Sequence, residues 1–188
     1  MNNIFNNNFY YVAKAPNAEE LIDFVSKVPV DNKAKIKWNE RCNVDVIGLN
    51  NQTAVDMINP CIIKFLDHVG DRPQQLWVEG PWMNQYNKYG YQDIHAHGSH
   101  HFAINFISNT GEDFADFYFY DKNTAEIPDV VKNYLKMVDI HTPKLEAGDF
   151  IVFPSHLLHG VTMHKSDVPR RTLSTNFSID IQTHSMHT

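Results

Sequence analysis

The spacing of apolar residues follows a helical period in two segments of the first 75 residues. It predicts one helix over 18–28, with Asn17 in the capping position and Pro29 after its end, and a second helix over 53–69. Pro60 lies inside the second helix and leaves open whether that helix is continuous, kinked or split, while Gly70 is expected to end it. Between the helices, KIKW (35–38) and VDVIG (44–48) alternate like short strands, and a turn is expected at 50–51.

From Leu76 onward the apolar residues alternate, with turn residues at intervals typical of a β-sandwich or barrel. The segment 128–139 is open between a short helix and a loop followed by a strand. We therefore expect a mainly β fold with flanking helices: one domain over 1–188, with a helical or mixed flank at 1–75 and a β core at 76–182. The expected core strands lie within 80–88, 101–108, 113–121, 149–155, 159–164 and 171–180.

Composition narrows the class of protein. A chain of 188 residues with 43% apolar content can bury one core, and a net charge of −6 without basic clusters argues against non-specific nucleic-acid binding. Cys42 and Cys61 lack metal-site spacing and read as ordinary thiols of a reducing compartment. The N-terminus lacks signal-peptide features, and no apolar window is long enough for a membrane span. We expect a cytoplasmic protein without membrane contact, either monomeric or a homodimer.

A histidine-rich segment, QDIHAHGSHHFAINFIS at 92–108, carries the candidate chemistry. Alternate residues of an extended chain share a face, so His95 and His97 are expected to point at one metal ion. His159, at the start of another β-like segment, is the best candidate for a third ligand. Three protein ligands leave positions open for substrate or oxygen. An HxH pair alone is a weak signal, because the chain contains 11 histidines.

The downstream context is more specific. The strings WMN, HAH, GDFIVFPSHLLHGV and RRTLSTNF make residues 80–177 resemble the iron(II)- and 2-oxoglutarate-dependent oxygenases, in particular a small group common in phage and marine bacterial genomes. The resemblance implies a double-stranded β-helix, a cupin-like jelly roll. It also implies Fe(II), 2-oxoglutarate as co-substrate, O2, and hydroxylation of a small-molecule or peptide substrate. A phage-encoded member would act in the host cytoplasm.

The same resemblance assigns the metal ligands. His95 takes the place of the first iron ligand and His159 that of the distal histidine. The superfamily pattern has HxD or HxE, and here His97 stands in the carboxylate position. Asp93, two residues before His95 on the same strand face, is the alternative second ligand. We favour His97.

Arg170 aligns with the basic residue that anchors the far carboxylate of 2-oxoglutarate, which a planar guanidinium matches with two hydrogen bonds. Thr172 lies on the same strand face, whereas Arg171 faces the other way as a surface charge. A shift of one residue in register would exchange the two arginines. Further candidates for this pocket, each also open to a structural hydrogen-bonding role, are Asn84, Tyr86 and Asn176.

The remaining histidines have less specific interpretations. We expect His100 and His101 in the barrel wall, with one of them near the substrate, His156 at a corner, and His184 and His187 in a polar tail. Two functions from other classes stay open. One is a cupin-like dioxygenase that uses three histidines without 2-oxoglutarate, and the other is a non-catalytic jelly-roll module for binding or structure.

Overall fold

The computed structural model describes residues 1–188 except 6–7, 31–40, 50, 71–72 and 181–188. The helices are α1 (Ala18–Lys27), α2 (Gln52–Val69), α3 (Lys122–Ala125) and α4 (Asp129–Leu135). The strands are β1 (Asn2–Ile4), β2 (Asn8–Lys14), β3 (Asp45–Gly48), β4 (Leu76–Val78), β5 (Trp82–Tyr86), β6 (Gln92–His95), β7 (Phe102–Ile107), β8 (Phe117–Tyr120), β9 (Ile140–His141), β10 (Asp149–Pro154), β11 (His159–Val161) and β12 (Arg170–Ile179).

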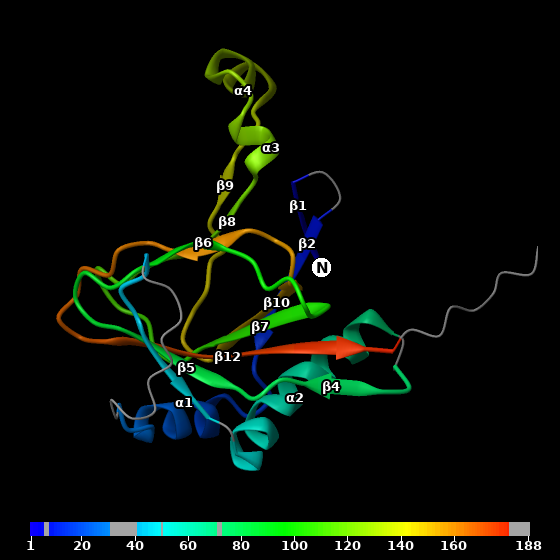
Figure 1. Cartoon of the computed structure of the whole chain (residues 1–188), viewed down its shortest axis with the longest axis vertical. Coiled ribbons are helices and arrows are strands. Elements are labelled where there is room, and N and C mark those ends of the chain that lie inside the picture. Colours follow the sequence, from blue (N-terminus) through cyan, green and yellow to red (C-terminus); the bar gives the residue numbers. More distant parts are fainter. Residues whose placement is uncertain (6–7, 31–40, 50, 71–72, 181–188) are drawn as a thin grey trace, which may run out of the picture.

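Two antiparallel sheets build the body of the molecule. The larger sheet has the order β1-β2-β10-β7-β12-β5-β3, with β4 also paired to β12, and the smaller sheet has the order β6-β11-β8-β9. In Figure 1, α1 and α2 cover the outer face of the larger sheet, and the smaller sheet lies on its other side. The expected fold class is confirmed: a mainly β jelly roll with flanking helices.

Two apolar clusters show why the layers form. The cluster between helices and larger sheet joins Leu21 of α1 and Phe65 of α2 to Phe150 and Phe177, which are all at most 1% exposed. The second cluster lies between the sheets and includes Phe119 and Phe153. Strands with alternating side chains therefore serve both clusters, one with each face.

The predicted helices are confirmed, with one difference in detail. Asn17 precedes α1, but its side chain makes no capping bond and donates instead to the carbonyl oxygen of Met57, 2.9 Å away. Helix α2 runs through Pro60 without interruption and ends at Gly70, whose φ of 95° favours glycine. The open segment 128–139 forms the short helix α4, and the α3–α4 segment projects away from the body (Figure 1).

All six core strands predicted from the alternation are present. Strand β2, which pairs along β10 in the larger sheet, was not predicted, although its sequence NFYYVAK is rich in aromatic residues that favour strands. VDVIG forms β3, whereas KIKW lies outside the described residues. No helix among the described residues is long and apolar enough to cross a membrane.

Candidate metal centre

His95 and His159 face each other as a cross-strand pair. His95 ends β6 and His159 begins β11, and the two are partners in the antiparallel register between these strands. Their ring centroids lie 4.2 Å apart. Strand pairing therefore brings together two histidines that are distant in the sequence.

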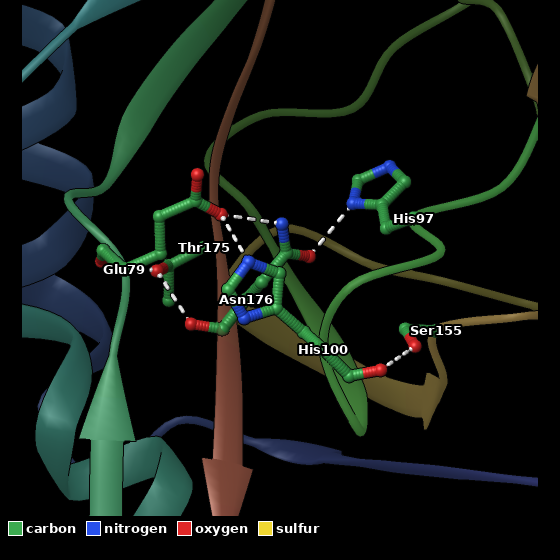
Figure 2. A network of polar contacts seen from close by, with 6 residues as sticks. All are labelled: Glu79, His97, His100, Ser155, Thr175 and Asn176. Carbon is green, nitrogen blue, oxygen red and sulfur yellow. Dashed lines mark hydrogen bonds and ion pairs between the residues drawn. The ribbon is translucent and has the colours of Figure 1, made fainter.

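His97 reaches this pair from a loop. His95 and His97 both contribute to the metal-binding group, as expected, but they do not lie on one strand, because β6 ends at His95. The loop is instead held by Ser155: the His97 amide donates to the Ser155 carbonyl at 2.8 Å, the Ser155 amide donates to His101 O at 3.0 Å, and the Ser155 hydroxyl donates to the carbonyl of His100 (Figure 2). The His97 ring centroid lies 5.2 Å from that of His95 and 5.1 Å from that of His159.

Hydrogen bonds at Nδ1 orient all three rings. In each case the partner is a carbonyl or amide oxygen, which can only accept, so Nδ1 carries the proton and Nε2 carries the lone pair. Metal-binding histidines are commonly oriented in this way by a bond from the second ring nitrogen. The bonds run from His95 to Asp93 O (2.8 Å), from His97 to Asn176 Oδ1 (2.7 Å) and from His159 to Leu157 O (2.8 Å).

Burial keeps the three imidazoles neutral. It lowers the pKa of His95 to about 4, lowers the pKa of His97, and lowers the pKa of His159 well below its usual value, because the charged imidazolium is poorly solvated there. Metal binding requires neutral imidazole, so at pH 7 the ligands need not lose a proton first.

The donor set fits a divalent iron. One nitrogen from each of the three histidines lies within 4.8 Å of the others, and imidazole is a suitable ligand for iron. Nitrogens that bind one ion at about 2.1 Å lie roughly 3 Å apart, so a small closure of the rings suffices. Among the described residues this group contains no carboxylate. The alternative ligand Asp93 lies outside it, and its Oδ1 accepts a bond from the Ile94 amide at 2.8 Å.

The three histidines line a cavity of about 330 Å³ between the two sheets. This volume is at the lower end of the range for small-molecule sites. Apolar walls come from Phe117 and Phe153, and a polar wall comes from the inner face of the larger sheet. The cavity thus combines a metal-binding end with both apolar and hydrogen-bonding surfaces.

A chain of buried polar side chains forms that polar wall. Asn84 of β5 donates through Nδ2 to the hydroxyls of Thr172 (3.3 Å) and Ser174 (3.1 Å), and Ser174 Oγ donates to Asn105 Oδ1 at 3.2 Å. The Oδ1 atom of Asn84 is buried and has no hydrogen-bond partner among the described residues. An unpaired buried polar atom costs stability, which is typical of a surface built to receive a ligand.

Arg170 and Arg171 point to opposite sides of β12. Arg170 is 3% exposed and lies over the ring of Tyr86 at 5.2 Å, and its buried Nη1 has no hydrogen-bond partner within the residues that the structure describes. Burial lowers the pKa of its guanidinium. Arg171, expected as an exposed surface charge, instead donates from Nη1 to carbonyls at the end of α1, including Ser26 O at 2.8 Å.

The predicted pocket residues divide into two groups. Asn84 and Asn176 line the cavity, whereas Thr172, Arg170 and Tyr86 lie beyond it along the same inner face of β12 and β5. The Tyr86 hydroxyl donates to Gln92 Oε1 at 2.5 Å, so this side chain is held in place.

Five further polar residues that line the cavity were missed: Glu79, Gln92, Ser99, Asn105 and Ser174. Ser174 lies between Thr172 and Asn176 at strand spacing, so the alternation alone could have found it. Glu79 lies in the connection between β4 and β5 and carries no pattern in the sequence.

The other histidines in the part of the chain that the structure describes lie outside the metal-binding group. His100 is 3.4 Å from a Glu79 oxygen, and His101 Nδ1 accepts from the Ile179 amide at 3.2 Å. His156 is exposed at a corner, as predicted. His184 and His187 fall outside the described residues.

The sequence of this chain is similar to that of one protein family. The sequence model of a family described as "Putative 2OG-Fe(II) oxygenase" matches residues 80–176, just over half of the 188 residues. No curated protein sequence matches the chain.

Solved structures with the same fold include three enzymes, each 12% identical to the chain. An oxidoreductase of the 2OG-Fe(II) oxygenase family from Burkholderia pseudomallei has a TM-score of 0.64, with 90% of this chain and 84% of that chain covered. The α-ketoglutarate-dependent epimerase SnoN from nogalamycin biosynthesis has a TM-score of 0.67, with 92% and 77% covered. The viral collagen prolyl hydroxylase from Paramecium Bursaria Chlorella virus-1, in its 2OG complex, has a TM-score of 0.61, with 95% and 100% covered. The family match, on a fold shared with such enzymes, shows that this chain belongs to the 2OG-Fe(II) oxygenase family.

Proposed function

We propose that His95, His97 and His159 hold the Fe(II) of this oxygenase, and that Arg170 with Thr172 holds the far carboxylate of 2-oxoglutarate. The observation that carries the metal assignment is that three histidines from β6, the following loop and β11 converge while each donates through Nδ1. When bound, Fe(II) and 2-oxoglutarate supply an oxidant from O2 that attacks a C–H bond, with release of succinate and carbon dioxide. We propose hydroxylation as the outcome.

The polypeptide contributes orientation and charge. The Nδ1 bonds hold each imidazole with Nε2 toward the metal, and three neutral ligands leave the full charge of the ion to attract an anionic co-substrate. The unpartnered Nη1 of Arg170 is a donor suited to a carboxylate, and the ring of Tyr86 holds the guanidinium from one side. We propose that the amides of Asn84 and Asn176 form the polar wall beside the co-substrate.

The organic substrate is proposed to enter the same cavity. Trp82, Phe117 and Val161 give that cavity an apolar surface beside the histidines. Such a surface positions a C–H bond near the metal and excludes water from the reaction. This is compatible with a small molecule or with one side chain of a peptide.

We also propose that 1–188 form one domain, since β2 and β3 of the N-terminal 75 residues pair within the same sheet as β12.

The net charge of −6 supports the absence of non-specific nucleic-acid binding. A homodimer in the cytoplasm, which would be host cytoplasm for a phage-encoded protein, is tested by the mass in solution and by localisation of the tagged chain.

Succinate release tests the proposed function directly. Protein without a histidine tag is mixed with Fe(II), O2 and labelled 2-oxoglutarate, and an absorption band from 2-oxoglutarate chelated to Fe(II) is recorded without oxygen. We expect both signals in the wild type and in His156→Ala, a matched control on the same segment, and neither in His159→Ala. Metal binding without either signal would favour a three-histidine enzyme that does not use 2-oxoglutarate, and absence of metal binding would favour a non-catalytic module.

A further inference from the structure

Glu79 is fastened to β12 directly beside the metal-binding group. Its amide donates to the carbonyl of Asn176 at 2.9 Å, and its carbonyl accepts from the hydroxyl of Thr175 at 2.6 Å (Figure 2). These two bonds fix the backbone at the connection between β4 and β5. The direction of the Glu79 side chain is therefore set by the sheet.

The carboxylate of Glu79 holds the side-chain amide of Asn176. Glu79 Oε2 accepts from Asn176 Nδ2 at 2.6 Å, and Asn176 Oδ1 accepts from His97 Nδ1 at 2.7 Å. His100 Nε2 lies 3.4 Å from the same carboxylate oxygen. Figure 2 shows the row Glu79, Asn176 and His97, with His100 alongside.

His97 differs from the other two histidines in the kind of oxygen that orients it. His95 and His159 donate to backbone carbonyl oxygens, which cannot exchange places with a nitrogen by rotation. His97 donates to a side-chain amide, whose oxygen and nitrogen exchange places when it rotates by half a turn. A rotated amide would present N–H groups to Nδ1 and so favour the wrong tautomer of the ring.

We propose, on the basis of the iron site proposed above, that Glu79 is a positioning residue of the metal centre. Of the two ends of the Asn176 amide, only the nitrogen can donate to this carboxylate, so Glu79 keeps the amide oxygen toward His97. His97 then keeps its proton on Nδ1 and presents Nε2 to the metal. The side chain of Glu79 is 45% exposed, so its replacement leaves no buried void.

Co(II) titration of the purified full chain measures this role without turnover. The dissociation constant and the visible absorption of bound Co(II) report affinity and ligand geometry. We expect Glu79→Ala to weaken Co(II) binding about 10-fold, as for other partners of metal-bound histidines, with a changed Co(II) spectrum. Glu79→Gln retains an acceptor for the Asn176 amide and is expected within about 3-fold of the wild type. Glu126→Ala, an exposed acid on the projecting segment, is the control.

Testing Glu79→Ala in a protein that already carries Asn176→Asp distinguishes a positioning role of Glu79 from a general structural role. Asn176→Asp replaces the amide by a carboxylate, which accepts through either oxygen and has no wrong orientation. In this background Glu79→Ala should cause no further loss of Co(II) affinity, because nothing is left to orient. A structural role of Glu79 would give the same loss in both backgrounds.

The outcomes also separate this proposal from the proposed iron site. If the wild type does not bind Co(II), or if His97→Ala binds it equally well, the iron site itself is wrong. If His97→Ala weakens binding while Glu79→Ala does not, only the role of Glu79 is overturned. A loss in Glu79→Gln as large as that in Glu79→Ala would equally overturn it, since an acceptor for Asn176 is still present.

Discussion

The two faces of the larger sheet bury different kinds of side chain: apolar ones on the face toward the helices, and polar or charged ones on the face toward the cavity. The face toward α1 and α2 is filled by Leu173 and Phe177, which are fully buried among other apolar side chains. The face toward the cavity carries Arg170 and Ser174 from the same strand, and no described residue bonds to Arg170 Nη1. One strand thus supplies stability with one face and chemistry with the other.

The two faces differ in their effect on the stability of the fold. Burying apolar surface contributes roughly 25 cal/mol per Å² to stability, whereas an unsatisfied buried polar group costs about 1–3 kcal/mol. The helix-facing side should therefore determine the free energy of unfolding, and the cavity-facing side should determine binding. Substitutions on the two sides are expected to separate these quantities.

The largest effect is expected from His159→Ala, on the cavity side. Loss of one of three metal ligands should reduce 2-oxoglutarate turnover by more than about 100-fold, beyond the effect of losing a partner of a ligand. The wild type should gain about 2.7 kcal/mol of stability at a Co(II) concentration 100 times its dissociation constant, and the variant should gain none. Thermal melts with and without Co(II) measure this. Equal metal stabilisation in both proteins would contradict the assignment.

Phe150→Ala tests the helix-facing side. Phe150 is fully buried in the cluster with the helices, so the variant should lose about 3–5 kcal/mol of unfolding free energy in urea. The Co(II) affinity of its folded fraction should not change. Phe153→Ala, on the same strand, is the matched comparison: the Phe153 ring lies 4.8 Å from that of His159, so this change should also weaken metal binding. Equal effects on Co(II) affinity would break the division between the faces.

The helix-facing side was also the more predictable one. Alternation and helical spacing identified α1, α2 and all six core strands, because an apolar face must be buried whatever its exact partners. Strand β2 was not predicted because the apolar residues of NFYYVAK form a continuous run and do not alternate with polar ones.

The cavity side was predicted only in part. His95 and His159 were placed correctly beside each other, since both lie at strand ends that pair. His97 lies beside them because backbone hydrogen bonds to Ser155 position its loop, and the spacing of residues in the sequence does not predict these bonds. Glu79 went unnoticed because the partner of a side-chain amide depends on which segments meet in space.

Arg170→Leu is expected to weaken 2-oxoglutarate binding without lowering the free energy of unfolding. Removing the guanidinium should weaken 2-oxoglutarate binding by about 2–5 kcal/mol, seen as a rise in KM for 2-oxoglutarate and in its dissociation constant for the Co(II) protein. The ligand-free variant should be at least as stable as the wild type in urea, because an apolar side chain replaces a buried charge. A large loss of stability with unchanged 2-oxoglutarate binding would assign Arg170 to the structural side.

The smallest effect is expected from Arg171→Ala, one residue away on the opposite face. Arg171 Nη1 donates to the carbonyl oxygens of Val25 (3.1 Å), Ser26 (2.8 Å) and Val28 (3.3 Å), and its positive charge lies at the C-terminal end of α1. Its removal should lower the free energy of unfolding by about 1–2 kcal/mol, measured in urea, and leave KM for 2-oxoglutarate unchanged. Arg171→Lys should recover only part of the loss, because an ammonium lacks the planar fork that reaches several carbonyls. If Arg171→Ala raised this KM more than Arg170→Leu does, the register of β12 would be shifted by one residue and its two faces would exchange roles.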